Sequence, residues 1–187
     1  GAGARARRRG GAGGAAALAL AGAVLGADGL AGRVSVAQGD ISARFADLGL
    51  APFDAAMANP PFFDDPGALR GPAPERRGAW LADEGLAAWT AFLGKAVREG
   101  GAITVIHRAE RLTDLLDLLS VKAGSIQVRP VHPFADAPAK RVLVRAIKSG
   151  KAPLRLLPPL VLHARGGPKH TAEAEAVLRG EAALGWL

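Results

Sequence analysis

Short apolar runs alternate with longer amphipathic segments along most of this chain. Runs of strand length occur at 33–37, 53–58 and 102–106, and the last of them is continuously apolar, as expected of an interior parallel strand. The segments 82–98 and 109–123 carry leucines and aromatic residues at helical spacing on one face. The pattern therefore predicts strands and helices that alternate in sequence.

The C-terminal half ends this alternation with two strands in succession. Residues 125–129 and 140–148 are predicted to form a closing antiparallel pair. Alternating strands and helices followed by an antiparallel pair are typical of a doubly wound α/β fold.

The N-terminal segment has a different character. Residues 1–14 contain only Gly, Ala and Arg, which predicts a flexible tail in front of a domain that covers 15–187. The small apolar run 15–27 favours a helix that ends near Gly29. Together with the arginines before it, this run also imitates a secretory signal, which is the alternative interpretation.

Composition narrows the classes of function. A chain of 187 residues is long enough to bury a real core, and without cysteine it has neither disulfides nor a thiolate metal site. Its four histidines lack the spacing of metal ligands, so we expect no metal. The net charge of +7 favours a polyanionic partner. No apolar stretch reaches the roughly 18 residues that a membrane span needs.

The most informative stretch is Asn59-Pro60-Pro61-Phe62, directly after the run at 53–58, which is predicted to form a buried strand. A residue before proline is held extended, and Pro61 fixes the next turn without an amide hydrogen. The loop then offers two acceptors, the Asn59 amide oxygen and the Pro60 carbonyl, beside the Phe62 ring. Such a loop suits a planar group that carries an NH2, because it holds both hydrogens and aims the nitrogen lone pair at an electrophile. A plain turn after a strand is the alternative.

The tetrapeptide resembles the motif of the amino-methylating branch of the class I S-adenosylmethionine-dependent methyltransferases. Three later stretches, at 139–146, 157–163 and 171–180, resemble the bacterial tRNA adenine-N6 methyltransferase group in the same order. The resemblance extends over roughly residues 15–187. It implies a Rossmann-like methyltransferase sheet, mostly parallel with an antiparallel C-terminal edge.

The resemblance also implies a reaction. S-adenosyl-L-methionine is the expected cofactor, and Asn59, Pro60, Pro61 and Phe62 are the expected catalytic loop. The expected acceptor is the exocyclic amine of a nucleobase in RNA, with adenine N6 of a tRNA first. Methylation of guanine N2 in rRNA and of a protein glutamine use similar motifs and stay open. A cytoplasmic location without membrane attachment is implied; the oligomeric state is left open.

The N-terminus departs from the family's pattern. That family opens with an apolar strand, a Gly-rich turn and a second strand that ends in an acid for the cofactor ribose, but no acid occurs between Gly1 and Ala27. Gly1 and Gly3 are the candidates for the turn. We therefore expect an altered cofactor-binding part and a sheet that lacks the first strands. A non-catalytic RNA-binding remnant is the alternative from another class of protein.

Loss of a first strand would leave the strand at 53–58 with an unpaired edge, which is costly or prone to aggregation. We expect either that the strand at 33–37 pairs with it or that a partner chain covers it. We also expect residues 1–14 to lack regular structure.

Further residues are predicted to contact the cofactor or the RNA. Gly39 and Asp40 follow the strand at 33–37, and in the resembling family this acid accepts from the adenine amine of the cofactor. An aspartate that caps a helix or turn beginning near Ile41 is an equally weighted alternative. The candidate contacts to RNA are Phe63, Arg70, Arg76 and Arg77, together with Lys140 and Arg141.

Overall fold

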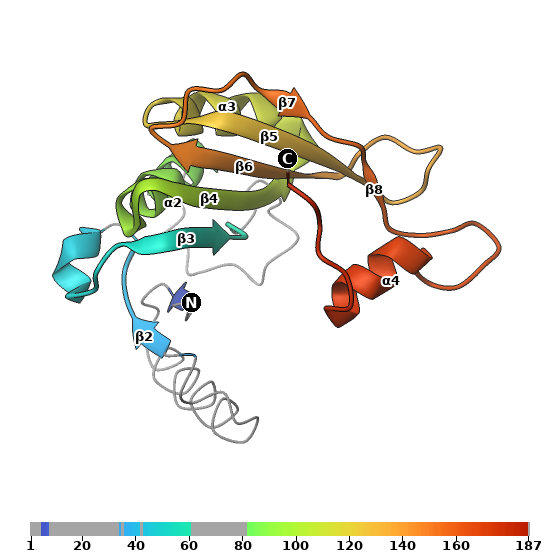
Figure 1. Ribbon diagram of the computed structural model, residues 1–187, viewed down its shortest axis with the longest axis horizontal. Helices are drawn as coiled ribbons and strands as arrows, with labels where there is room; N and C mark the ends of the chain where they lie inside the picture. The colour runs from blue at the N-terminus through green and yellow to red at the C-terminus, as the bar shows by residue number, and fades with distance from the viewer. Residues whose placement is uncertain (1–4, 8–33, 35, 42, 61–81, 187) are drawn as a thin grey trace, which may run out of the picture.

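The computed structural model describes residues 5–7, 34, 36–41, 43–60 and 82–186. These residues form a central mixed sheet with two helices on one face, and a C-terminal extension that projects past the end of the sheet (Figure 1). The helix predicted at 15–27 lies outside the described residues.

The central sheet has six strands in the order β3-β4-β6-β5-β7, and β8 also pairs with β5. The strands are β3 (Phe53–Ala58), β4 (Val97–Arg108), β5 (Ala123–His132), β6 (Arg141–Lys148), β7 (Arg155–Leu156) and β8 (Leu160–Val161). β3 pairs in parallel with β4, and β7 and β8 pair in parallel with β5. β6 is antiparallel to both β4 and β5. The predicted mostly parallel sheet with an antiparallel strand near its C-terminal side is confirmed.

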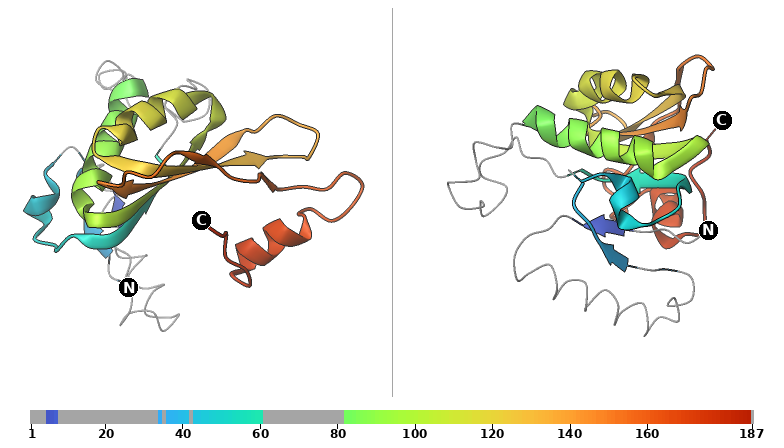
Figure 2. Two further views of the ribbon diagram at one scale, coloured as in Figure 1. Left: turned by 45° about the horizontal axis from the view of Figure 1, so that its top comes forward. Right: turned by 90° about the vertical axis from the view of Figure 1, so that its left-hand side faces the viewer.

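Two helices cover one face of this sheet. They are α2 (Ala82–Ala96) and α3 (Leu112–Ser120), the latter preceded by the short 3-10 turn η3 (Ala109–Arg111). Figure 2 shows both on the same side of the strands. Their leucines pack against alternate residues of β4, β5 and β6, as the helical spacing predicts. The buried members of this core are Leu86, Leu93, Val97, Ile103, Val105, Leu115, Leu119, Ala123, Ile126, Val128, Val142, Val144 and Ala146.

The boundary between α2 and β4 differs from the prediction. The helix ends at Ala96, and β4 begins at Val97 rather than near residue 102. Gly100 has a φ of 74°, and a Cβ on Gly101 would lie 2.8 Å from the Arg98 carbonyl oxygen and 3.0 Å from that of Asp54. The two glycines therefore allow a close approach of β4 to β3 and do not simply stop the helix.

The N-terminal strands form a separate small sheet. β1 (Arg5–Arg7) and β2 (Val36–Gln38) pair in parallel, and neither joins the central sheet. The expectation that residues 1–14 lack regular structure is therefore wrong for Arg5–Arg7. The expectation that the strand at 33–37 pairs with β3 is wrong for its described residues, because β2 pairs with β1 instead.

β3 occupies an edge of the described sheet, with β4 as its only hydrogen-bonded neighbour there. The interpretation of 53–58 as a buried strand is wrong, since Asp54, Ala55 and Met57 are exposed. Met57 keeps 81% of its surface accessible. The expected unpaired edge is thus present among the described strands, and its cover by a partner chain stays a prediction.

The C-terminal extension consists of β8, a loop and α4 (Ala172–Arg179). Thr171 caps α4, because its hydroxyl oxygen accepts from the Ala174 amide at 3.1 Å, and Gly180 ends the helix with a φ of 74°. Figure 1 shows the chain returning from α4 to the sheet at its C-terminus. No helix among the described residues is both long and apolar enough to cross a membrane.

Candidate active site

Asn59 lies at the edge where the parallel strands end. Ala58, the last residue of β3, is in register with Val105 of β4, so Asn59 and Pro60 come beside the carboxyl end of β4. Ligands in open α/β sheets bind outside the carboxyl ends of the strands. The position predicted for the acceptor site is therefore one at which this class of fold places its ligands.

The two described residues of the motif differ sharply in burial. Asn59 is exposed, whereas Pro60 is less than 2% exposed and ranks among the most buried side chains. The buried Pro60 ring restricts the backbone next to Asn59, while the exposed Asn59 amide can hydrogen-bond to a ligand. An accessible amide on a well-packed support suits the positioning of a planar amine.

The other predicted residues of this loop and of its surroundings lie outside the described residues. They are Gly1, Gly3, Pro61, Phe62, Phe63, Arg70, Arg76 and Arg77. Their roles in catalysis, cofactor binding and RNA contact stay predictions.

The structure does not bring Asp40 together with Asn59. Ile41, the next residue, belongs to an apolar cluster with Phe45, whose ring lies 5.8 Å from that of Phe53 at the start of β3. β3 spans about 17 Å from Phe53 to Ala58 at the rise of a strand, and Asn59 follows its far end. Figure 1 likewise shows β2 leading into the 3-10 helix η1 (Phe45–Leu48) on the side where β3 begins.

Gly39 and Asp40 nevertheless form a tight, partly buried turn. A Cβ on Gly39 would lie 3.1 Å from a methyl carbon of Leu48, so a larger residue would press on η1. The Asp40 carbonyl oxygen accepts from the Ala43 amide at 3.0 Å. Among the described residues, this backbone turn agrees with the alternative in which Asp40 belongs to a turn near Ile41. The cofactor contact of Asp40 stays a prediction.

Basic residues from two segments, the end of β4 and the start of β6, gather at the same edge as Asn59. β6 begins there, with Arg141 in register with Arg108 at the end of β4. The Lys140 carbonyl accepts from the Ala109 amide at 3.3 Å, which ties the start of β6 to the end of β4. The predicted RNA contacts Lys140 and Arg141 therefore share an edge with Asn59. Arg108 was not among the sequence candidates, because only the strand register places it there.

His107 is another residue of this edge, and it is only 5% exposed. Its burial on β4 agrees with a role in the core, as its position in a strand suggests. Within the described part of the chain, no group of three or more histidine, aspartate or glutamate side chains could hold a metal ion.

Among the described residues, two carboxyl groups have lowered pKa values, and neither lies beside Asn59. The hydrogen bond from Ser149 holds the pKa of Glu99 below its ordinary value, with Lys148 adding to the effect. Glu99 sits near the start of β4, at the opposite edge of the sheet. The hydrogen bond from Arg165 lowers the pKa of Asp136, which lies in the loop between β5 and β6. Both shifts reflect local hydrogen bonds, from Ser149 to Glu99 and from Arg165 to Asp136.

No family model matches this chain, and no curated protein matches its sequence. Its structure is similar to that of a protein described as a predicted O-methyltransferase, from Agrobacterium tumefaciens. The TM-score is 0.75 at 20% identity, over 97% of this chain and 78% of the other. A SAM-dependent O-methyltransferase from Thermotoga maritima matches with a TM-score of 0.49 at 16% identity, over 80% of this chain and 50% of its own. The second likeness is too weak to carry an argument. The first shows that this chain has a methyltransferase fold.

Proposed function

We propose that this protein transfers a methyl group from S-adenosyl-L-methionine to the exocyclic amine of a nucleobase in RNA, with adenine N6 of a tRNA as the first candidate. The observation that carries the proposal is the exposed Asn59, set on the buried Pro60 at the carboxyl edge of a methyltransferase fold. The Asn-Pro-Pro-Phe sequence at this place supports an amine acceptor.

The loop's own groups would hold the acceptor. The Asn59 amide oxygen accepts one amine hydrogen and the Pro60 carbonyl accepts the other, so the nitrogen lone pair points away from both. A hydroxyl has only one hydrogen and cannot engage both acceptors, which favours an amine over an oxygen acceptor. When bound, the cofactor supplies a methyl group on a positively charged sulfur. The amine nitrogen would form its bond to the methyl carbon as the carbon–sulfur bond breaks and its electron pair leaves with the sulfur, and the amine would then release a proton to water.

The two sides of the site are supported unequally. The acceptor side fits at Asn59, which is exposed where the strands end, while Pro60 beside it is buried. On the cofactor side, Asp40 lies near the opposite end of β3. Cofactor affinity is therefore the measurement that separates an enzyme from an RNA-binding remnant of the fold.

Charge supports RNA as the acceptor. The chain carries 24 Lys and Arg against 17 Asp and Glu, and Arg108, Lys140 and Arg141 lie on the edge that holds Asn59. Within this class, guanine N2 and a protein glutamine amide present the same NH2 group and are the other acceptors to test.

The test is methyl transfer by Asn59→Ala, measured with a labelled methyl group and bulk tRNA. We expect a loss of activity of about a hundredfold or more, because misplacement of a reacting group by about 1 Å can cost that much. Met57→Ala is the matched control: Met57 is 81% exposed on β3, the strand that leads to Asn59, and the activity of this variant should stay unchanged. Full activity in Asn59→Ala, or tRNA binding without any affinity for the cofactor, would overturn the proposal.

A further inference from the structure

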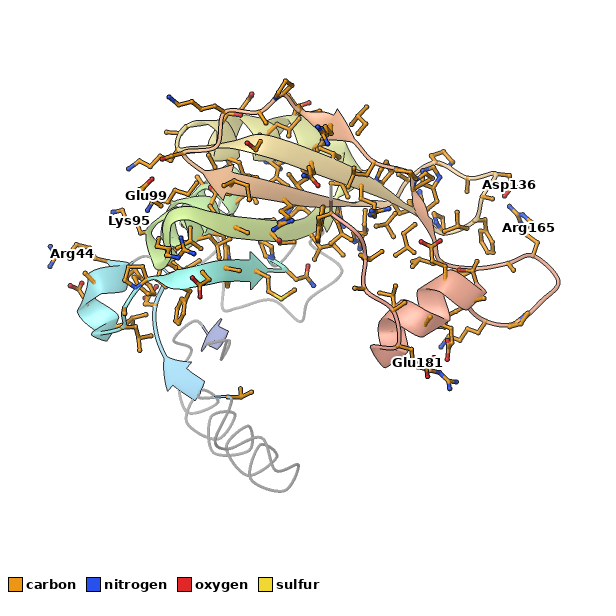
Figure 3. The ribbon with its side chains drawn as sticks, in the orientation of Figure 1. Arg44, Lys95, Glu99, Asp136, Arg165 and Glu181 are labelled. Carbon is orange, nitrogen blue, oxygen red and sulfur yellow. The ribbon has the colours of Figure 1, made fainter. Side chains whose placement is uncertain are left out.

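Two loops form a single projecting arm at the edge where Asn59 lies. Residues 133–140 join β5 to β6, and residues 162–170 join β8 to α4. β3, β4, β5 and β8 all run the same way, so both loops begin at the carboxyl ends of strands. Figures 1 and 2 show these loops reaching beyond the sheet. In Figure 3, Asp136 and Arg165 mark the tip of the arm.

The backbone ties the two loops of the arm together. The Leu162 amide donates to the His132 carbonyl at 2.8 Å, and the His163 amide donates to the Pro133 carbonyl at 2.9 Å. His132 itself contacts the Ala137 carbonyl through Nδ1 at 2.7 Å. The arm therefore continues the sheet as a tied pair of segments, and its side chains have set positions.

Planar side chains gather on this support. The Arg165 guanidinium lies 4.5 Å from the centre of the Phe134 ring, and its Nε donates to both carboxylate oxygens of Asp136 at 3.0 and 3.1 Å. The ring centres of Phe134 and His163 are 5.6 Å apart. His163 in turn stacks on His170 at 5.2 Å with an angle of 26°. Three rings and one guanidinium thus form one contiguous group, which we call the ring cluster.

The arm is also basic and has little apolar surface to offer. Residues 133–140 and 162–170 contain one acidic residue, Asp136, and three cationic residues, Lys140, Arg165 and Lys169. None of the exposed large hydrophobic side chains found in the described part of the chain belongs to the arm. Stacking groups combined with cationic side chains are how proteins hold unpaired nucleotides. A protein or membrane partner would need apolar contacts that this surface does not supply.

We propose that the arm binds unpaired nucleotides that flank the base presented to Asn59. Bases stack on the ring cluster, and phosphates pair with Lys169 and with Lys140 at its root. This inference rests on the proposed function and deepens it, because it assigns the RNA contact to a defined element at the same edge of the sheet. It also gives the acceptor a preferred form, an RNA loop or single strand.

The test is a double charge reversal, Arg165→Glu with Lys169→Glu, against the control pair Arg44→Glu with Lys95→Glu. Arg44 pairs with Asp47 at 3.0 Å, as Arg165 pairs with Asp136 at 3.0 Å, and all four side chains in these ion pairs are well exposed. Figure 3 shows Arg44 and Lys95 at the opposite end of the molecule. Both double variants change the net charge equally, so a difference between them reports on location.

Affinity for single-stranded RNA and for tRNA is measured by fluorescence anisotropy over a salt series, without cofactor. We expect the arm variant to bind at least tenfold more weakly than the control variant. Its slope of log K against log salt should fall by about 0.7, because the one phosphate contact assigned to Lys169 is lost. Phe134→Leu keeps an apolar side chain but removes the π face, and should weaken binding about fivefold or more.

The outcomes separate this inference from the proposed function. Equal affinity of the arm and control variants for RNA overturns the inference, even if methyl transfer to RNA persists. Arm-dependent RNA binding without any methyl transfer upholds the arm and overturns the proposed reaction. Unchanged RNA binding together with loss of methyl transfer to a protein glutamine would reassign the arm to a protein partner and overturn the inference.

Discussion

Arg129 is a buried charge whose removal should loosen the C-terminal segment. Its side chain lies on the sheet face opposite α2 and α3, and the residue is only 8% exposed. Its Nη1 donates to the Pro158 carbonyl at 2.8 Å, and its Nη2 donates to the Gly185 carbonyl at 2.5 Å. The guanidinium of Arg129 thus joins β5 to the chain that returns from α4. Nearby, Arg145 lies 5.7 Å from the Trp186 ring centre.

The expected loss in the free energy of unfolding follows from the interactions that Arg129→Met removes. Two hydrogen bonds from a charged donor are worth about 1.5–3 kcal/mol each. Against this loss, the buried Nε has no hydrogen-bond partner among the described residues, and its burial costs about 1–3 kcal/mol that the substitution relieves. Pro158 and Gly185 are exposed, so water can replace the guanidinium at their carbonyls. We expect a net loss of about 2–3 kcal/mol in the free energy of unfolding.

Urea unfolding measures this loss, and Arg155→Met is the matched control. Arg155 is exposed on β7, beside Gln127 of β5, and its substitution should change the free energy of unfolding by less than about 0.5 kcal/mol. Trypsin cleavage after Arg179 reports on the C-terminal segment and should accelerate only in Arg129→Met. Identical urea midpoints for the two variants would refute the reasoning. A lower midpoint with an unchanged cleavage rate would show that Arg129 stabilises the sheet and does not anchor the C-terminus.

Two further predictions test local geometry. A Cβ on Gly124 would overlap the Gly150 carbonyl oxygen, whereas one on Gly94 meets nothing within 4 Å. Gly124→Ala should therefore lower the free energy of unfolding by about 3 kcal/mol or more, and Gly94→Ala within α2 should raise it by about 0.5–1 kcal/mol; equal urea midpoints would contradict the close approach. Because Arg165 lowers the pKa of Asp136 from its ordinary 3.8, their contact stabilises the fold above that value and is lost as the pH falls through the folded pKa. Arg165→Ala should raise this pKa in an NMR titration of the carboxyl carbon, and an unchanged pKa would show that the contact is absent in solution.

The sequence predicted those elements whose signals are local. The strand predicted at 53–58 has the same bounds as β3. Its signal is local, because the strand is a short apolar run and Pro60, two residues after it, prevents its continuation. The antiparallel pair of β5 and β6 was also predicted. The predicted end of α2 was wrong, because Gly100 and Gly101 look like a signal that ends a helix but lie within β4. A glycine that terminates one element and a glycine that lets two strands approach look alike in sequence.

Other features depend on pairing between distant residues and leave no local signal. β7 and β8 have two residues each, too short for any periodic pattern. Arg129 is a charged residue of a strand, and it contacts two segments distant in sequence, at Pro158 and at Gly185. Arg108 joins the edge of Asn59 solely through the register of β4 with β6.

The candidate site likewise combines a residue with a local sequence signal, Asn59, and one whose place depends on strand pairing, Asp40. Asn59 was identified from a contiguous motif, and the structure sets it at the carboxyl edge of the sheet because a strand that ends must present its next residues there. Asp40 was assigned by analogy to a sheet in which its strand is aligned with β3. Here β2 pairs with β1 outside the central sheet, so the pairing of β2 does not align Asp40 with Asn59. The proposed cofactor and acceptor contacts therefore rest on independent features, and Asn59→Ala should leave cofactor affinity intact, as Asp40→Ala should leave RNA affinity intact.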